Sequence, residues 1–263
     1  MISDFLKQII KEAGFLAKGY YREGIEYQTK SDPTDLVTQA DREVNNFLIK
    51  KIREKYPTHG IISEEEPDEI NPGAEYTWVI DPVDGTRNFA NHIGVWCTMI
   101  GITKNNEPYL GAVYDALNDE LFFAEVGQGA FLNDKPIKVS TTVDVKSFSI
   151  VFSCGQNRNN SPYNIGEEKL KKYLRFYHNL THQDGHWVAN FSTALSICHL
   201  SAGRLDTYMM CGGLYHDYLP GFIIATEAGA RFTDSDGQIW QRGRKDSLVA
   251  NPQLHQKLLR LFE

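Results

Sequence analysis

The stretch WVIDPVDGTRNF, residues 78–89, combines a short apolar run, two aspartates and a turn. The apolar triplet at its start predicts a buried strand that ends at Asp81. Pro82 and Gly85 then turn the chain, and a helix can begin at Thr86. The free N–H groups at the start of that helix would face an anion.

Asp81 and Asp84 are three residues apart in this stretch. Two bare carboxylates at one turn would repel each other, and a bound divalent cation would relieve that repulsion. The alternative is structural, with Asp84 serving only as a helix cap. The pair alone therefore leaves both interpretations open.

Two further acidic segments have structural explanations of their own. In IISEEE, residues 61–66, Ser63 and Glu66 have the spacing of a helix capping box, and acidic runs are commonly solvated. In HDYLPGFIIATEAGA, residues 216–230, Asp217 is a candidate N-cap for a helix with a proline in its first turn and a glycine just after its end.

The rest of the chain mixes helical and strand patterns. Helical spacing of apolar residues predicts a first helix over residues 3–21. Thr38 and Asp41 form a capping-box-like start to a second helix, which Pro57 ends. Short apolar runs between turn residues predict an antiparallel meander over residues 95–139. Further strands are expected at 147–152, 205–210 and near 248, and further helices at 167–180, 192–202, about 218–228 and from 254 to the end.

Composition excludes several classes of protein. The 263 residues carry a formal net charge of −7, which disfavours binding to a nucleic-acid backbone. The sequence contains no apolar run of the length that a membrane span needs. The four cysteines form no CxxC pair, so we expect reduced thiols and a cytoplasmic protein.

Taken together, these segments resemble the inositol monophosphatase family of magnesium-dependent, lithium-sensitive phosphatases. The resemblance covers nearly the whole chain, in the order and spacing of the family. Its most specific part is IDPVDGT, followed late in the chain by an aspartate before an apolar helix. The matching segments are DLVTQAD at 35–41, SEEE at 63–66, IDPVDGT at 80–86, AGRLD at 202–206 and HDYLPG at 216–221.

The resemblance implies an α+β fold, a layered αβαβα sandwich of the inositol monophosphatase and fructose-1,6-bisphosphatase type. Residues 1–142 would form an N-terminal half with the antiparallel sheet and most metal ligands. Residues 143–263 would form a C-terminal half that supplies Asp217 and substrate-pocket residues, within one integrated catalytic fold. Relatives are commonly homodimers, so a homodimer is expected here by analogy.

The resemblance also implies a ligand set for two or three Mg²⁺ ions. Glu64, Asp81 and the backbone carbonyl of Val83 match the ligands of a first ion. Asp81, Asp84 and Asp217 match those of a second, so that Asp81 would bridge the two. This all-oxygen set suits Mg²⁺, a hard cation.

Catalytic roles follow from the same resemblance. Glu64 and the hydroxyl of Thr86 would orient a water for in-line attack on phosphorus, and Asp41 would hydrogen-bond Thr86. The N–H groups of Gly85 and Thr86 would hold phosphate oxygens. Lys30 matches an accessory lysine near the metals.

Substrate choice is less defined than reaction type. The expected substrate is inositol monophosphate or a related small sugar or polyol phosphate, although Met210 stands where inositol-preferring relatives carry an acidic residue. Alternatives in the superfamily are a 3′(2′),5′-bisphosphate nucleotidase, a fructose-1,6-bisphosphatase and a histidinol-phosphatase. A different alternative is a regulatory protein that keeps the fold and binds a protein partner. The implied substrate contacts are Asp84, Gly85, Thr86, Ser192, Thr193, Met210 and Asp217.

Overall fold

The largest sheet is built almost entirely from one antiparallel meander. The computed structural model describes residues 1–23, 27–29, 36–154, 161–182, 186–189 and 193–262. Within it, adjacent strands of this seven-stranded sheet are antiparallel, except for the parallel pair at the β3 edge. In spatial order the strands are β3 (Gly60–Ser63), β4 (Tyr76–Asp84), β5 (Cys97–Lys104), β6 (Glu107–Asp115), β7 (Glu120–Glu125), β8 (Gly129–Leu132) and β9 (Lys135–Ile137).

Turn chemistry explains why this meander could be predicted. Asn105 and Asn106, between β5 and β6, both have positive φ, and so do Asn133 and Asp134 between β8 and β9. A two-residue hairpin turn of this kind requires positive φ at both central positions, which Asn and Asp tolerate best after Gly. The predicted meander over residues 95–139 is confirmed.

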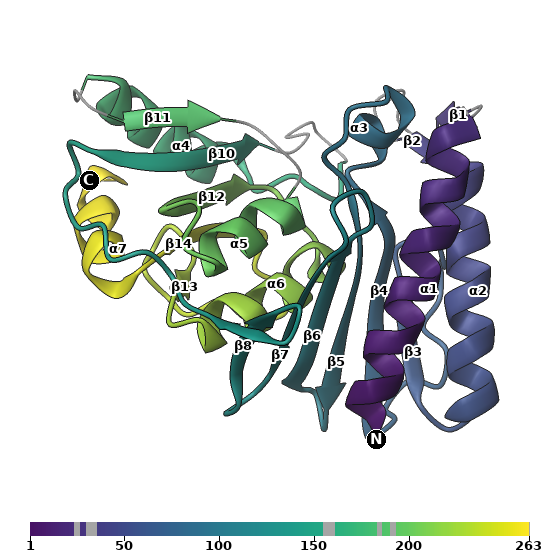
Figure 1. The fold of residues 1–263 in the computed structure, drawn as a ribbon. Coiled ribbons are helices and arrows are strands. Elements are labelled where there is room, and N and C mark those ends of the chain that lie inside the picture. The colour runs from purple at the N-terminus through teal and green to yellow at the C-terminus, as the bar shows by residue number, and fades with distance from the viewer. Residues whose placement is uncertain (24–26, 30–35, 155–160, 183–185, 190–192, 263) are drawn as a thin grey trace.

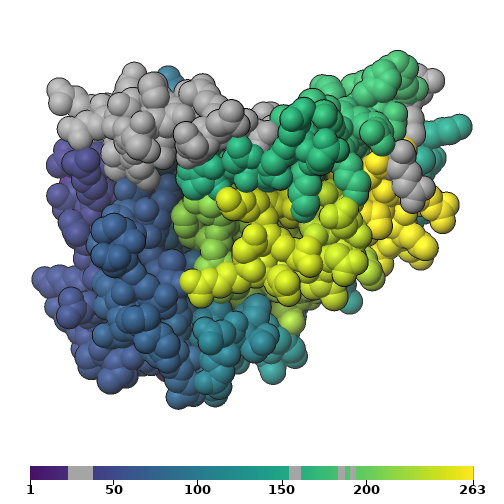
Figure 2. Space-filling model, turned by 180° about the vertical axis from the view of Figure 1, so that it is seen from behind, coloured from purple at the N-terminus to yellow at the C-terminus, as the bar shows by residue number. Residues whose placement is uncertain are grey.

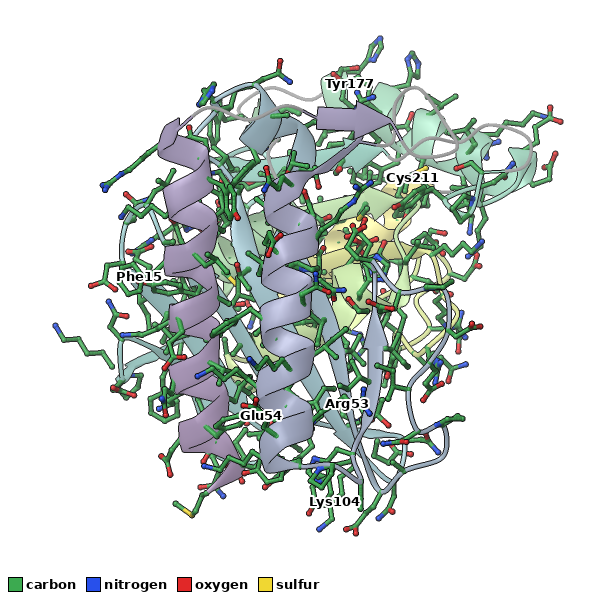
Figure 3. All side chains as sticks on the ribbon, turned by 90° about the vertical axis from the view of Figure 1, so that its right-hand side faces the viewer. Phe15, Arg53, Glu54, Lys104, Tyr177 and Cys211 are labelled. Carbon is green, nitrogen blue, oxygen red and sulfur yellow. The ribbon has the colours of Figure 1, made fainter. Side chains whose placement is uncertain are left out.

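Two long helices, α1 (Ile2–Glu23) and α2 (Gln39–Lys55), lie side by side on one face of this sheet (Figures 1 and 3). The predicted capping box of α2 is present: the Thr38 hydroxyl accepts from the N–H of Asp41, and the Asp41 carboxylate accepts from the N–H of Thr38. The helix ends before Pro57, as expected. A short antiparallel pair, β1 (Tyr27–Thr29) and β2 (Leu36–Thr38), precedes α2.

The second sheet is mixed and comes from the C-terminal part of the chain. Its spatial order is β11 (His186–Ala189), β10 (Phe148–Cys154), β12 (Thr207–Cys211), β14 (Asp246–Ala250) and β13 (Arg231–Thr233). The strands predicted at 147–152, at 205–210 and near 248 are present with ends shifted by a few residues, whereas β11 and β13 were not predicted.

Five layers result from the way in which helices cover the two sheets. Helices α5 (Thr193–Ser201) and α6 (Tyr215–Glu227) fill the space between the sheets, where one apolar core joins them to both. Helices α4 (Glu167–Thr181) and α7 (Pro252–Leu259), with a 3₁₀ turn over Arg260–Phe262, pack on the outer face of the second sheet. The predicted αβαβα sandwich is confirmed.

The expected division near residue 142 falls between β9 and β10, the last strand of one sheet and the first of the other. Seen from behind, the N-terminal residues in purple and blue and the C-terminal residues in green and yellow lie side by side on one face (Figure 2). No helix in the described part of the chain is long and apolar enough to cross a membrane.

Candidate metal centre and active site

An irregularity in β4 brings two aspartates to the same place. We expected the strand to end at Asp81, but it continues to Asp84. Asp81 pairs with Met99 and Asp84 pairs with Cys97, so three steps along β4 face two steps along β5. In a regular strand, residues three apart point to opposite faces. The extra residue of the bulge allows Asp81 and Asp84 to point to the same side.

The bulge is fixed by bonds to the neighbouring strand and helix. The Thr98 hydroxyl donates to the carbonyl of Pro82 at 2.9 Å, inside the bulge. One carboxylate oxygen of Asp84 accepts from the N–H of Ala194, in the first turn of α5, at 3.1 Å, and the thiol of Cys97 lies 3.5 Å from the same oxygen. Ala194 and Cys97 are contacts that the sequence reasoning missed, because they depend on strand register and on packing between the two halves.

Asp217 arrives from the other side of the molecule on α6. The helix begins at Tyr215, so Asp217 is not the N-cap that we expected but the third helical residue. Its carboxylate turns back and accepts from the N–H of Leu214, the N-cap residue, at 2.5 Å. A carboxylate in this position bonds an N–H that the helix itself leaves unpaired and lies near the positive end of the helix dipole.

Glycines in the sheet let α6 approach closely enough. A Cβ atom on Gly111 would lie 2.6 Å from the carbonyl oxygen of Pro220, and one on Gly101 would lie 2.8 Å from the Leu219 side chain. Any side chain at these positions would push α6 outward. The close contact therefore helps to bring Asp217 to β4.

Asp81, Asp84 and Asp217 converge so that one carboxylate oxygen from each lies within 4.8 Å of the others. Asp81 is 2% exposed, and its Oδ1 has no hydrogen-bond partner among the described residues. Burial raises the pKa of Asp81 well above its usual value, and the charges of Glu64, Asp84 and Asp217 raise it further. Burial likewise raises the pKa of Asp217 to about 6.

The donor set of this cluster fits a hard divalent cation. A buried carboxylate oxygen without a partner is costly unless a positive charge lies against it. Three closely spaced carboxylates also repel one another, and a cation between them would offset that repulsion. Mg²⁺ and Ca²⁺ prefer oxygen ligands. We therefore identify Asp81, Asp84 and Asp217 as the carboxylates that can hold a metal.

Glu64 lies at the edge of the cluster. It follows β3 in the turn Ser63–Glu66, and its N–H donates to the carbonyl of Ile80 at 3.1 Å. Its charge raises the pKa of both Asp81 and Asp217, although it is not one of the three carboxylates within 4.8 Å of one another.

Asp41 and Thr86 meet between α2 and the short helix α3 (Thr86–Ala90). The Thr86 hydroxyl oxygen lies 3.1 Å from the carbonyl oxygen of Val83 and 3.4 Å from Asp41 Oδ1, and its one proton can go to either acceptor. Burial raises the pKa of Asp41 to about 7, against two hydrogen bonds from Thr38 that lower it. The expected pairing of Asp41 with Thr86 is thus geometrically possible.

Other expected site residues are placed as follows. Gly85 is the N-cap of α3 and has a φ of 87°, a left-handed conformation that favours glycine. Met210 is buried in the core between the sheets, 5% exposed. Thr193 begins α5. Lys30 and Ser192 lie outside the described residues.

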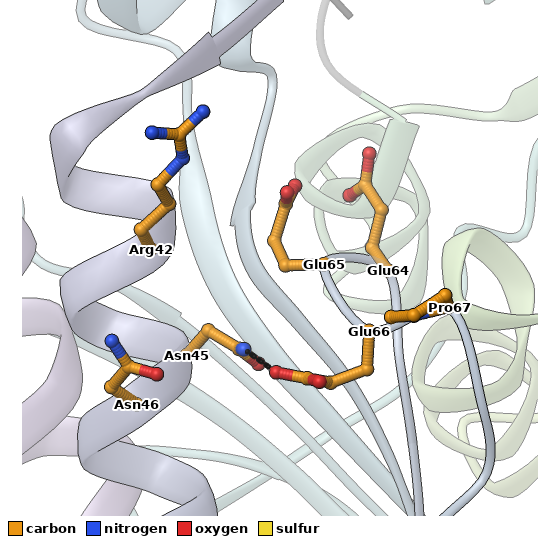
Figure 4. A pocket seen from close by; sticks show the side chains of 7 residues that line it. All are labelled: Arg42, Asn45, Asn46, Glu64, Glu65, Glu66 and Pro67. Carbon is orange, nitrogen blue, oxygen red and sulfur yellow. Dashed lines mark hydrogen bonds between the residues drawn. The ribbon is translucent and has the colours of Figure 1, made fainter.

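The capping-box interpretation of Ser63 and Glu66 is wrong, because these residues form a turn that leads into no helix. Instead, both side chains bond to Asn45 on α2. The Ser63 hydroxyl donates to Asn45 Oδ1 at 2.7 Å. Figure 4 shows the second bond, in which Asn45 Nδ2 donates to Glu66 Oε1 at 2.7 Å.

Comparison with known proteins gives one consistent result. A sequence model of the inositol monophosphatase family matches residues 2–263. An inositol-1-monophosphatase of Bacillus subtilis is 32% identical over 260 residues, which are 98% of this chain and 94% of the relative. An inositol monophosphatase structure from Anabaena superposes with a TM-score of 0.83 at 31% identity, covering 99% of this chain and 94% of that one. The extragenic suppressor protein suhB from Bartonella henselae superposes with a TM-score of 0.89 at 26% identity, covering 100% and 98%.

Proposed function

Because the chain belongs to the inositol monophosphatase family, whose members are metal-dependent phosphatases, we propose that it is a Mg²⁺-dependent phosphomonoesterase. Its substrate would be inositol monophosphate or a related small sugar or polyol phosphate. The observation that carries the proposal is the convergence of Asp81, Asp84 and Asp217 around a buried oxygen of Asp81 that has no hydrogen-bond partner among the described residues. Such a cluster costs stability in the empty protein, which argues for a function that uses it.

In this proposal the metal ligands are the three aspartates, Glu64 and the carbonyl of Val83. Two or three Mg²⁺ ions would supply positive charge to the phosphate and lower the pKa of water. Burial raises the pKa of Asp81 and of Asp217, and the neighbouring carboxylates raise both further. A phosphate dianion could not enter so acidic a site without cations.

The chain's own residues would orient the reactants. Glu64 and the Thr86 hydroxyl would hold a water, and buried Asp41, whose Oδ1 lies 3.4 Å from that hydroxyl, would accept a hydrogen bond from it. The N–H groups of Gly85 and Thr86 would hold phosphate oxygens. Proximity and orientation of this kind supply much of the rate enhancement in phosphoryl transfer.

Asp84→Asn tests the proposal directly. The amide oxygen of the variant can still accept from the N–H of Ala194, so the fold should persist while a ligand charge is lost. We expect Mg²⁺-dependent phosphate release to fall by roughly a hundredfold or more, with a parallel loss of Mg²⁺ binding in calorimetric titration. The matched control is Asp68→Asn, at an exposed aspartate after the Ser63–Glu66 turn, which should change neither quantity. Wild-type rates in the Asp84 variant would overturn the assignment.

The substrate is tested by a phosphate-release panel with Mg²⁺. The panel contains inositol, sugar and histidinol monophosphates, fructose 1,6-bisphosphate and adenosine 3′,5′-bisphosphate. The proposal expects the inositol or sugar monophosphates to be hydrolysed fastest. A preference for the nucleotide or histidinol ester would replace the substrate but keep the reaction type, and no hydrolysis of any ester would overturn the enzyme itself.

The proposal also includes that the protein is a homodimer in the cytoplasm. It rests on the analogy with relatives and on the cysteine pattern. Sedimentation of the purified protein at a monomer mass would remove the dimer from it.

A further inference from the structure

The turn that carries Glu64 is held to α2 by the buried side chain of Asn45, which is 3% exposed. Asn45 bonds Ser63 on one side of Glu64 and Glu66 on the other, each at 2.7 Å. The amide oxygen accepts from the Ser63 hydroxyl, and the amide nitrogen donates to the Glu66 carboxylate, which when ionised can only accept. Both flanks of Glu64 are therefore fixed by one residue on the neighbouring helix.

A pocket of about 500 Å³ lies beside this bridge, between α2 and the turn (Figure 4). Arg42, Asn45 and Asn46 line it from the helix, and residues 64–67 line it from the turn. Space of this size means that the turn does not rest on the helix through continuous side-chain packing. The hydrogen bonds of Asn45 therefore have a large part in setting the distance between turn and helix.

The spacing along α2 connects this bridge to the rest of the site. Asn45 follows Asp41 by four residues, which puts both on the same face of the helix, and both are buried. Asp41 faces Thr86 on one segment, and Asn45 bonds Ser63 and Glu66 at both ends of the segment that carries Glu64. One rigid helix thus relates the two segments to each other.

We propose that Asn45 is a positioning residue, which sets the place of the Glu64 carboxylate relative to Asp81 and Asp217. The inference rests on the proposed function, in which Glu64 orients the attacking water. Asn45 does not touch the reacting atoms in this proposal. It acts through the Ser63–Glu66 turn, so its loss should reduce kcat more than it changes KM.

Asn45→Asp is the informative substitution. It keeps the shape of the side chain and still accepts from Ser63, but it sets a carboxylate against Glu66 where a donor is needed. Displacement of a catalytic group by about 1 Å can cost on the order of a hundredfold in rate. We expect kcat to fall about tenfold to a hundredfold, with KM changed less than about threefold, for the panel ester that the wild type hydrolyses fastest.

Two double variants separate the hydrogen bond from the charge. N45D/E66Q restores one donor and one acceptor with their places exchanged, and should recover kcat to within about threefold of wild type. N45D/E66A restores the net charge without the hydrogen bond, and kcat should stay low. The matched control Asn46→Asp adds the same charge at the next, exposed position of α2 and should leave kcat unchanged.

Thermal unfolding of each variant shows whether a lower kcat reflects only a smaller folded fraction. The single variant Glu64→Gln tests the role of Glu64 separately from that of Asn45. The positioning role is overturned if N45D keeps wild-type kcat, if E66A rescues as well as E66Q, or if kcat falls only in proportion to the folded fraction. An active Glu64→Gln would instead defeat the proposed role of Glu64. An inactive Glu64→Gln beside an unaffected N45D would leave the proposed function intact and remove Asn45 from it.

Discussion

Asp217→Asn should stabilise the metal-free protein. Asp217 is buried, and burial raises its pKa to about 6; His216 lowers this pKa, whereas Glu64 and Asp84 raise it. An acid whose pKa is higher in the folded than in the unfolded state destabilises the fold when ionised. The cost is absent below the unfolded pKa near 4 and is fully present above about pH 6. A difference of about two pH units at about 1.4 kcal/mol each gives a cost of about 3 kcal/mol.

The variant removes the charge and keeps the local structure. Its amide oxygen can still accept from the N–H of Leu214, which Asp217 bonds at 2.5 Å. Urea unfolding followed by tryptophan fluorescence in EDTA measures the effect. We expect a gain of about 3 kcal/mol at pH 8 and about half of that at pH 5, where the unfolded carboxyl is already ionised and the folded one is not. Saturating Mg²⁺ should reduce or reverse the gain, because it stabilises the wild type by binding the folded state.

Asp206→Asn provides a control of opposite sign. Burial alone would raise the pKa of Asp206, but hydrogen bonds from Ser140 and Ser149 hold that pKa below its usual value. This variant should therefore be less stable than wild type at both pH values. The reasoning is refuted if Asp217→Asn is no more stable than wild type in EDTA at pH 8, or if its gain is equally large at pH 5.

Two further predictions concern packing and inhibition. Gly111→Ala should lower the free energy of unfolding by about 1–3 kcal/mol, because its Cβ would lie 2.6 Å from the Pro220 carbonyl oxygen. Gly19→Ala should be neutral or stabilising, because no atom of the described residues would lie within 4 Å of its Cβ. Equal midpoints in thermal unfolding for the two variants would contradict this prediction. Li⁺ at micromolar to millimolar concentrations should inhibit Mg²⁺-dependent phosphate release, and full activity at high Li⁺ would separate the protein from lithium-sensitive relatives.

Local signals in the sequence predicted most of the fold because they act within a few residues. The capping box of Thr38 and Asp41 and the paired asparagines at 105–106 are satisfied by their own neighbours in the chain. The bulge in β4 was not predictable in this way. Two aspartates three residues apart fit a turn and a bulged strand equally well, and only the register against β5 distinguishes them.

The Ser63–Glu66 turn shows how a local pattern can mislead. Its spacing matches a capping box, but Pro67 would occupy the fourth position of the helix, where the first intrahelical N–H is needed. With no helix to cap, both polar side chains take a partner far away in the sequence, Asn45. The position of Pro67 was the signal in the sequence against a helix here. The pairing of Ser63 and Glu66 with Asn45 could not be read from the sequence, because it depends on tertiary packing.

Helix α6 begins earlier than the position of Pro220 favours, and this early start places Asp217 in the site. A start near Tyr218 would put Pro220 in the first turn, where proline costs little. The actual start at Tyr215 places Pro220 at the sixth helical position, where the residue lacks the N–H that would bond His216. The same start places Asp217 in the first turn, with its carboxylate bonded to Leu214 and directed to the strand aspartates. The missing helical hydrogen bond and the buried acidic cluster both reduce the stability of the fold in the same region. Such a concentration of unfavourable features is expected where function rather than stability sets the arrangement.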